Sequence, residues 1–110
     1  MAATINVRSD FAERPFGRYP KHGPYNGEVF RDKFLIPALR ASGRIVVILD
    51  GVKVYGSSFL EEAFGGLIRK EMITPQQFAN RVEIVSHDNP TLPTEISQYV
   101  AESYERYVPH

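Results

Sequence analysis

The sequence predicts an α/β domain in which helices pack against a small, mixed and mostly parallel β-sheet. Apolar, β-branched runs at Thr4–Arg8, Arg44–Asp50 and Arg81–Ser86 are typical of strands. The segments between and after them repeat apolar residues at helical spacing, and this alternation favours parallel pairing. The length of 110 residues and the hydrophobic content of 43% predict one domain with one core over residues 1–110.

The central strand is the clearest of the three. Arg44–Asp50 holds a continuous run of Ile, Val and Leu between two glycine-containing turns, which indicates a strand buried on both faces. In Thr4–Arg8 apolar and polar residues alternate, so this strand is expected at or near an edge of the sheet. Arg81–Ser86 supplies the third strand.

Helices are predicted both before and after the central strand in the sequence. Gly27–Ala41 begins after Asn26, a good N-cap residue, and is expected to kink at Pro37, which lacks a backbone N–H. A short helix is expected after Thr74, and the last helix is expected over Leu92–Tyr107.

The most regular helical pattern is Ser58–Lys70, which has one broad apolar face. Ser58 is expected to cap this helix in a capping box with Glu61. The pair Gly65-Gly66 inside it weakens a helix, so we expect a close crossing with a neighbouring element there.

The turn before this helix is a candidate binding site. Gly56, Ser57 and Ser58 stand between the end of a buried strand and the start of a helix, where free backbone N–H groups favour an anion. A phosphate on Ser57 or a bound anion would be stabilised there. The alternative interpretation is purely structural, with Ser58 as N-cap and Ser57 as a turn residue.

The long segment 10–26 is a second candidate, because basic residues alternate in it with aromatic ones. Arg14 and Arg18 lie among Phe16, Tyr19 and Tyr25. Such a loop suits a protein-binding surface, a nucleotide or nucleic acid, or only the covering of a sheet edge. The formal net charge of zero argues against strong binding of nucleic acid.

The formal net charge of zero is the sum of a basic first half and an acidic second half of the chain. Residues 1–55 hold nine Lys and Arg against five Asp and Glu, whereas residues 56–110 hold four against eight. Two alternatives follow: the folded chain presents a basic and an acidic surface, or folding mixes the charges. Glu61 and Glu62 are expected on the acidic surface, pointing in different directions, since adjacent helical residues do not share a face.

Other functions have weak signals. The chain has no Cys, and its three His have no metal-ligand spacing, so neither a metal nor a cofactor is expected. A hydrolase built on Ser57 and His87 is considered and not favoured, because the nucleophile motif Gly-x-Ser-x-Gly is incomplete. No apolar run is long enough to span a membrane and the N-terminus does not read as a signal peptide, so a cytoplasmic location is expected.

Residues 56–65, Gly-Ser-Ser-Phe-Leu-Glu-Glu-Ala-Phe-Gly, resemble the hallmark of a bacterial STAS-like family of unknown function. STAS domains have the fold of the anti-sigma factor antagonists. Upstream, the segment Arg-Pro-Phe-Gly-Arg at 14–18 and Gly-Glu-x-Phe at 27–30 are similar in kind and order to the loop and first helix of that family. The resemblance covers residues 10–90.

This resemblance implies a STAS-like fold and a non-catalytic signalling or adaptor module. In the antagonists, a kinase that is also an anti-sigma factor phosphorylates a serine in an Asp-Ser-Ser/Thr-Gly turn. That serine corresponds to Ser57, with Ser58 second, although Gly56 replaces the Asp and Phe59 the Gly. The implied partner is a histidine-kinase-like ATPase or an anti-sigma-type kinase.

The leading prediction is a phosphorylation-regulated partner switch, and the alternative is a domain that binds a small ligand, nucleotide or anion at Gly56–Ser58. Arg14 and Arg18 are expected to steer an acidic or phosphate-bearing partner. The candidate partner- or anion-binding residues are Arg14, Arg18, Gly56, Ser57, Ser58, Glu61 and Glu62.

Overall fold

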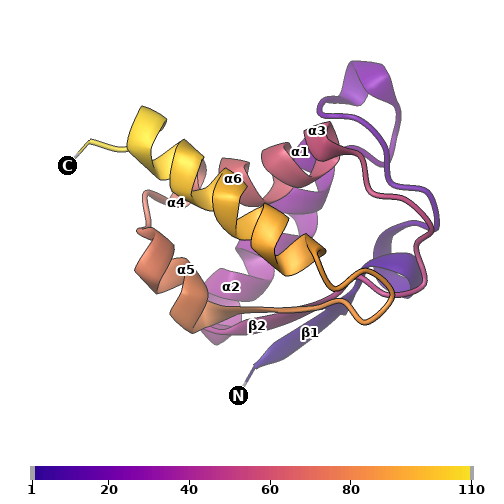
Figure 1. Cartoon of the computed structure of the whole chain (residues 1–110), viewed down its shortest axis with the longest axis horizontal. Helices are drawn as coiled ribbons and strands as arrows, with labels where there is room; N and C mark the ends of the chain where they lie inside the picture. Colours follow the sequence, from indigo (N-terminus) through magenta and orange to yellow (C-terminus); the bar gives the residue numbers. More distant parts are fainter. Residues whose placement is uncertain (1, 110) are drawn as a thin grey trace.

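A computed structural model describes residues 2–109, and its centre is a three-stranded parallel sheet (Figure 1). The strands β1 (Ala3–Asn6), β2 (Ile45–Ile48) and β3 (Val82–Val85) lie in the order β1-β2-β3. The predicted α/β class is confirmed, with the apolar run at the centre and the alternating strand at an edge. Both strand pairs are parallel, so no antiparallel strand makes the sheet mixed within the described residues.

Within residues 2–109, the helices cover one face of the sheet and not the other. Right-handed crossovers between parallel strands in this order put the connecting helices on the same side, and Figure 1 shows them gathered there. Along β2, Ile45 and Val47 are fully buried, whereas Val46 and Ile48 are only partly buried. The expectation that this strand is buried on both faces was wrong, because the apolar run lacks the period that would have revealed a half-covered strand.

The first long helix is continuous from residue 27 to 42 and contains a wider turn. It consists of α1 (Gly27–Phe30), the π-helical turn η3 (Arg31–Leu35) and α2 (Ile36–Ser42). Asn26 caps it, accepting a hydrogen bond from the N–H of Val29 at 2.9 Å. The predicted irregularity at Pro37 takes the form of this π turn, in which the N–H of Ile36 donates to the carbonyl of Arg31.

The second long helix begins one residue earlier than predicted. It consists of α3 (Ser57–Leu60), the π-helical turn η4 (Glu61–Gly65) and α4 (Gly66–Glu71). Its apolar face forms the centre of the core together with β2 and α1. The fully buried residues of that face are the predicted ones: Phe59, Leu60, Ala63, Phe64, Leu67 and Ile68.

Two further helices close the core. α5 (Pro75–Arg81) starts with the predicted cap, since Thr74 and Gln77 bond each other's backbone N–H at 3.1 and 2.8 Å. α6 (Leu92–Tyr107) has the predicted bounds and packs across η4 and α4. None of the helices within residues 2–109 has both the length and the apolar character to cross a membrane.

The long segment 10–26 is an ordered part of the fold. After β1 come the π-helical turn η1 (Val7–Phe11) and the short 3-10 helix η2 (Pro20–His22). The N–H of Phe16 bonds the carbonyl of Tyr25 at 2.8 Å, and the N–H of Gly27 bonds the carbonyl of Gly17 at 2.9 Å. The segment therefore returns to the start of α1 as a closed loop, and it carries Arg14 and Arg18 past the start of α3.

The carboxyl ends of β2 and β3 are joined by a carboxylate. Asp50 accepts hydrogen bonds from the backbone N–H groups of His87 and Asp88, at 2.6 and 2.8 Å, and from His87 Nδ1 at 3.0 Å. In return, Asp88 accepts from the N–H of Gly51 at 2.9 Å. These bonds hold the two loops that follow the strands in fixed relative positions.

The Asp50 clamp predicts a pH dependence of stability. The hydrogen bond from the Asp88 N–H, and then those from His87, outweigh burial and lower the pKa of Asp50 in the folded chain. A lowered carboxyl pKa stabilises the fold above the unfolded value of about 3.9, and this contribution is lost as pH falls through the folded pKa. In urea unfolding, Asp50→Asn should be less stable than the parent at pH 7, and the difference should shrink below about pH 4. A difference that stays constant with pH would contradict this role.

Candidate interaction site at the start of α3

The predicted turn lies exposed at the carboxyl end of the sheet. Gly56 is the N-cap of α3, and Ser57 and Ser58 are its first two residues, all three solvent-exposed. The first helical bond runs from the N–H of Leu60 to the carbonyl of Gly56 at 3.2 Å. The predicted capping box was wrong: Gly56 has no side chain to cap the helix, and the carboxylate of Glu61 binds arginines instead.

Ser57 lies beside α6. Its hydroxyl is close enough to Tyr99 to act on that residue by hydrogen bonding. Tyr99 donates its own hydroxyl proton to Glu95. Burial first, and then the Glu95 carboxylate, raises the pKa of Tyr99 to about 12, so the phenol stays protonated at neutral pH. The start of α3 is thus next to a hydrogen-bonded pair on the last helix.

Two hollows adjoin the turn and share Phe16 and Gly56. The first, which we call the serine hollow, has a volume of about 310 Å³. The second, which we call the basic cleft, has a volume of about 540 Å³. The serine hollow is lined by Phe16, Gly17, Arg18, His22, Gly56, Ser57, Ser58 and Phe59. The basic cleft is lined by Arg8, Glu13, Arg14, Pro15, Phe16, Gly51, Lys53, Val54 and Gly56.

Large exposed apolar side chains are concentrated on the two loops that form these hollows, and two of them, Phe16 and Val54, line the hollows directly. Six large apolar residues are exposed in the described chain, and four of them lie on the two loops that flank the turn. Phe16 is 66% exposed and Val54 is 74% exposed. Tyr19 and Tyr25 complete the group, and Tyr19 stacks on His22 with ring centroids 5.9 Å apart. Clustered exposed apolar residues mark interaction sites more often than scattered ones do.

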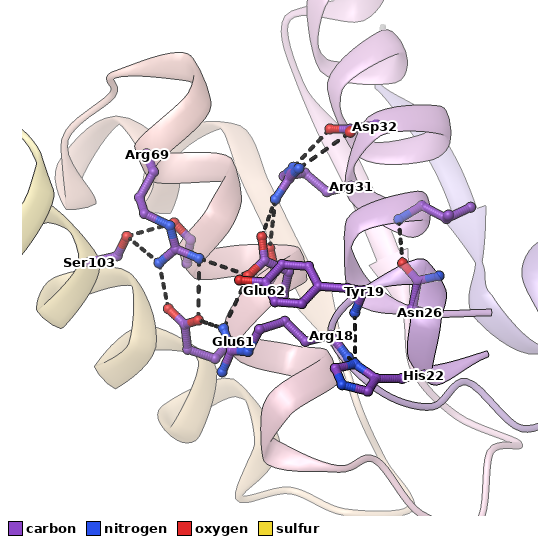
Figure 2. A network of polar contacts seen from close by, with 12 residues as sticks. Arg18, Tyr19, His22, Asn26, Arg31, Asp32, Glu61, Glu62, Arg69 and Ser103 are labelled. Carbon is purple, nitrogen blue, oxygen red and sulfur yellow. Dashed lines mark hydrogen bonds and ion pairs between the residues drawn. The ribbon is translucent and has the colours of Figure 1, made fainter. Parts of the chain in front are cut away.

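Glu61 and Glu62 do not form the expected acidic surface. Both carboxylates bind guanidinium groups in a cluster that we call the arginine–glutamate network: Arg18, Arg31, Glu61, Glu62 and Arg69 (Figure 2). Glu62 is buried, with 6% of its surface exposed. The two adjacent side chains reach shared partners because Arg18 and Arg69 each bridge from one carboxylate to the other. The prediction from helical geometry considered only the directions in which the two glutamate side chains leave the helix, and not arginines that contact both of them.

Glu62 has three cationic neighbours. It accepts a hydrogen bond from Arg18 at 3.1 Å and from Arg69 at 3.3 Å, and it forms a close ion pair with the buried Arg31. Arg31 also contacts Asp32 at 2.8 Å. These contacts connect the long loop, the first long helix and the second one.

The network also sets the ionisation of Glu61. Burial by itself would raise the pKa of Glu61, but hydrogen bonds from Arg69 and Arg18 outweigh it and lower the pKa. The same contacts raise the pKa of Arg18 against the effect of its burial. Arg18, which was expected to steer a partner, is therefore held by the chain's own carboxylates.

The glycine pair in this helix makes room for the network. A Cβ on Gly66 would lie 2.6 Å from an Arg31 guanidinium nitrogen, and one on Gly65 would collide with Glu61. The carbonyl of Gly65 accepts a hydrogen bond from Ser103 of α6 at 2.7 Å, and Ser103 accepts one from Arg69 at 3.0 Å. The expected close crossing is present, and the element that crosses is α6. The glycines also leave space for the charged side chains of Arg31 and Glu61.

Ion pairs join the basic first half of the chain to the acidic second half. Arginines from the first half pair with glutamates from the second, so folding mixes these charges. The pairs are Arg18 with Glu61 and Glu62, Arg31 with Glu62, and Arg40 with Glu71. The basic cleft is where cations of the first half stay together.

Of the predicted site residues, the structure brings Arg14, Gly56, Ser57 and Ser58 to the two hollows and places Glu61 and Glu62 in the network. Arg18 belongs to both. Arg31, Arg69 and Ser103 were not predicted. The only signal for them was the glycine pair, which sequence reasoning assigned to packing alone.

His87, one of the two residues considered for a hydrolase, is held by Asp50. The His87 ring contacts Asp50, and no hydrogen bond in residues 2–109 joins it to Ser57. Within the same residues, no group of three or more His, Asp and Glu side chains is arranged to hold a metal ion.

The parallel α/β fold agrees with the comparison of the chain with family models. Residues 26–92 match the model of a STAS-like domain of unknown function (DUF4325). The chain belongs to this STAS-like family. The match includes the serine turn, the glycine pair and four residues of the arginine–glutamate network, and Arg18 lies before it. No significant match was found among curated proteins or among solved structures.

Proposed function

We propose that this STAS-like domain is a non-catalytic protein–protein interaction module whose partner docks on the start of α3. The observation that carries the proposal is the exposed Ser57-Ser58 turn between loops that display four large apolar side chains. Aromatic and arginine side chains contribute most to binding energy at protein interfaces. Arg14, which is exposed beside Phe16, supplies the charge of such a surface.

The turn also suits regulation by phosphorylation. The N–H groups of Ser57, Ser58 and Phe59 precede the first helical hydrogen bond, and no side chain caps them. A phosphate on Ser57 would therefore meet free donors and the positive end of the helix dipole. The same phosphate would place about two negative charges in the middle of the docking surface. The likeness to anti-sigma factor antagonists suggests the partner class, a histidine-kinase-like ATPase.

The proposal predicts the behaviour of two substitutions. With a partner captured from the source cell and identified as such an ATPase, Ser57→Asp should weaken binding about tenfold, or roughly 1.4 kcal/mol, in calorimetry. The matched control is Ser97→Asp, because Ser97 is an exposed serine on the outer part of α6. It should leave binding unchanged.

Mass spectrometry after incubation with that ATPase and ATP should find phosphate on the serine turn of the parent and none on the variant with both Ser57 and Ser58 replaced by Ala. Equal binding by Ser57→Asp and the parent, together with an unmodified turn, would contradict the proposed function.

A further inference from the structure

The basic cleft has the size and place of a small-molecule site. It lies at the carboxyl ends of β1 and β2, between the loop that follows η1 and the loop that precedes α3. In parallel α/β sheets, ligands bind outside the carboxyl ends of the strands. The volume of about 540 Å³ is within the range of about 300–1,000 Å³ found for small-molecule pockets.

The charges around the cleft are unbalanced. Arg8, Arg14 and Lys53 face a single carboxylate, that of Glu13. Arg8 approaches Glu13 at 3.5 Å, and both side chains are more than half exposed. Neither Arg14 nor Lys53 has an ion pair in the part of the chain that the structure describes. Two cations thus remain for an anion, and guanidinium groups match the geometry of phosphate oxygens.

The remaining wall of the cleft is apolar. Phe16 and Val54 are 66% and 74% exposed although both belong to ordered loops. Phe16 and Val54 line the same cleft, and a flat ring could stack on the exposed face of Phe16, as nucleobases stack on aromatic side chains. An anionic group on that ring would then lie within reach of the cations.

The floor of the cleft is held in place before any ligand arrives. Gly51 has φ of +92°, and a Cβ on it would lie 2.7 Å from the Arg8 Cδ, so the Arg8 chain packs directly on the glycine. The N–H of Gly51 is held by Asp88 at 2.9 Å. A site formed in advance loses less entropy on binding.

We propose that the basic cleft binds a small phosphate monoester carried on a planar ring. The phosphate contacts Arg14 and Lys53, and the ring stacks on Phe16. This site goes beyond the proposed function, because it needs no protein partner and no modification of Ser57.

The test is an NMR titration of the ¹⁵N-labelled full chain with phenyl phosphate and, separately, with adenosine monophosphate. Both should give saturable shifts of the Gly51 and Gly56 amides, with a Kd of about 1 mM or below. Inorganic phosphate lacks the ring and adenosine lacks the phosphate, so each should bind at least about fivefold more weakly. Absence of saturation with both phosphate esters would overturn the proposal, and so would binding of a glutamate-rich peptide with no response to phenyl phosphate.

Four variants locate the site. Arg14→Ala and Lys53→Ala should each weaken phenyl phosphate about fivefold, as loss of an exposed charge-assisted hydrogen bond would. Their matched controls are Arg44→Ala and Lys33→Ala, which remove exposed charges outside the cleft and should leave the Kd unchanged. Equal effects of the cleft variants and their controls would show a general charge effect and overturn the proposal.

The ring contact has its own variant. Phe16→Leu should reduce the advantage of phenyl phosphate over inorganic phosphate while leaving the Kd for inorganic phosphate unchanged, because it removes the stacking surface and no charge. An undiminished advantage would place the ring elsewhere and contradict the proposed geometry.

Discussion

Replacing Glu62 by Ala is expected to lower the free energy of unfolding by about 3 kcal/mol, as removal of one member of a buried ion pair does. The Glu62 side chain is 7% exposed, and its carboxylate is contacted by Arg18, Arg31 and Arg69. Its loss leaves Arg31, whose side chain is 5% exposed, with Asp32 as its remaining carboxylate contact. Urea unfolding at pH 7 measures the effect.

The neighbouring glutamate is the matched control. Glu61 binds two of the same arginines, but its side chain is 23% exposed, so water replaces the lost contacts in part. Glu61→Ala should cost about 1 kcal/mol or less. A Glu62→Ala variant no less stable than Glu61→Ala would show that burial of the network does not determine its energetics.

Gly27→Ala should destabilise the fold by about 1–3 kcal/mol, the usual cost of overpacking. Gly27 is the first residue of α1, where Ala would ordinarily be the better helix former. In this fold a Cβ would lie 2.7 Å from the carbonyl oxygen of Phe59 and 3.2 Å from the backbone N of Ala63. Backbone atoms of a central helix cannot yield as a flexible side chain does, so α1 must move away from α3 and η4. Thermal unfolding measures the loss.

The control for this glycine is Gly56, which has no atom within 4 Å of the place a Cβ would occupy. Gly56→Ala should cost at most about 1 kcal/mol, from the less favourable N-cap. If both variants lose the same stability, the close approach of α1 to the second long helix is not what requires Gly27.

Much of the fold could be predicted because its signals are local. The alternating strand at Thr4–Arg8, the cap at Thr74 and the apolar face of Ser58–Lys70 each follow from the order of residues within a few turns of chain. In the structure, these three segments form, in that order, β1, the start of α5, and the buried face of α3, η4 and α4. The position of the serine turn at the end of the sheet follows in the same way, since a strand and a helix flank it.

The arginine–glutamate network could not be predicted because its members are far apart in the chain. Arg18 and Glu62 are separated by 44 residues and Arg31 and Glu62 by 31. Side-chain charge has no periodicity that reveals a partner at such a distance. Without that partner, adjacent glutamates on a helix look like an exposed acidic surface. The coverage of β2 escaped prediction for a related reason, since a continuous apolar run does not tell which face meets the helices.

The sequence by itself determined the class of the fold, the order of its elements, and the place of the serine turn between a strand and a helix. Those follow from hydrophobic period, helix caps and turn residues, all of which act over short stretches of chain. The tertiary structure decided which charges are neutralised and which remain available. It placed Arg18 and Arg31 against Glu61 and Glu62 and left Arg14 and Lys53 at an open cleft. The physical reason is that ion pairing depends on distance in space, which only the packed helices and loops set.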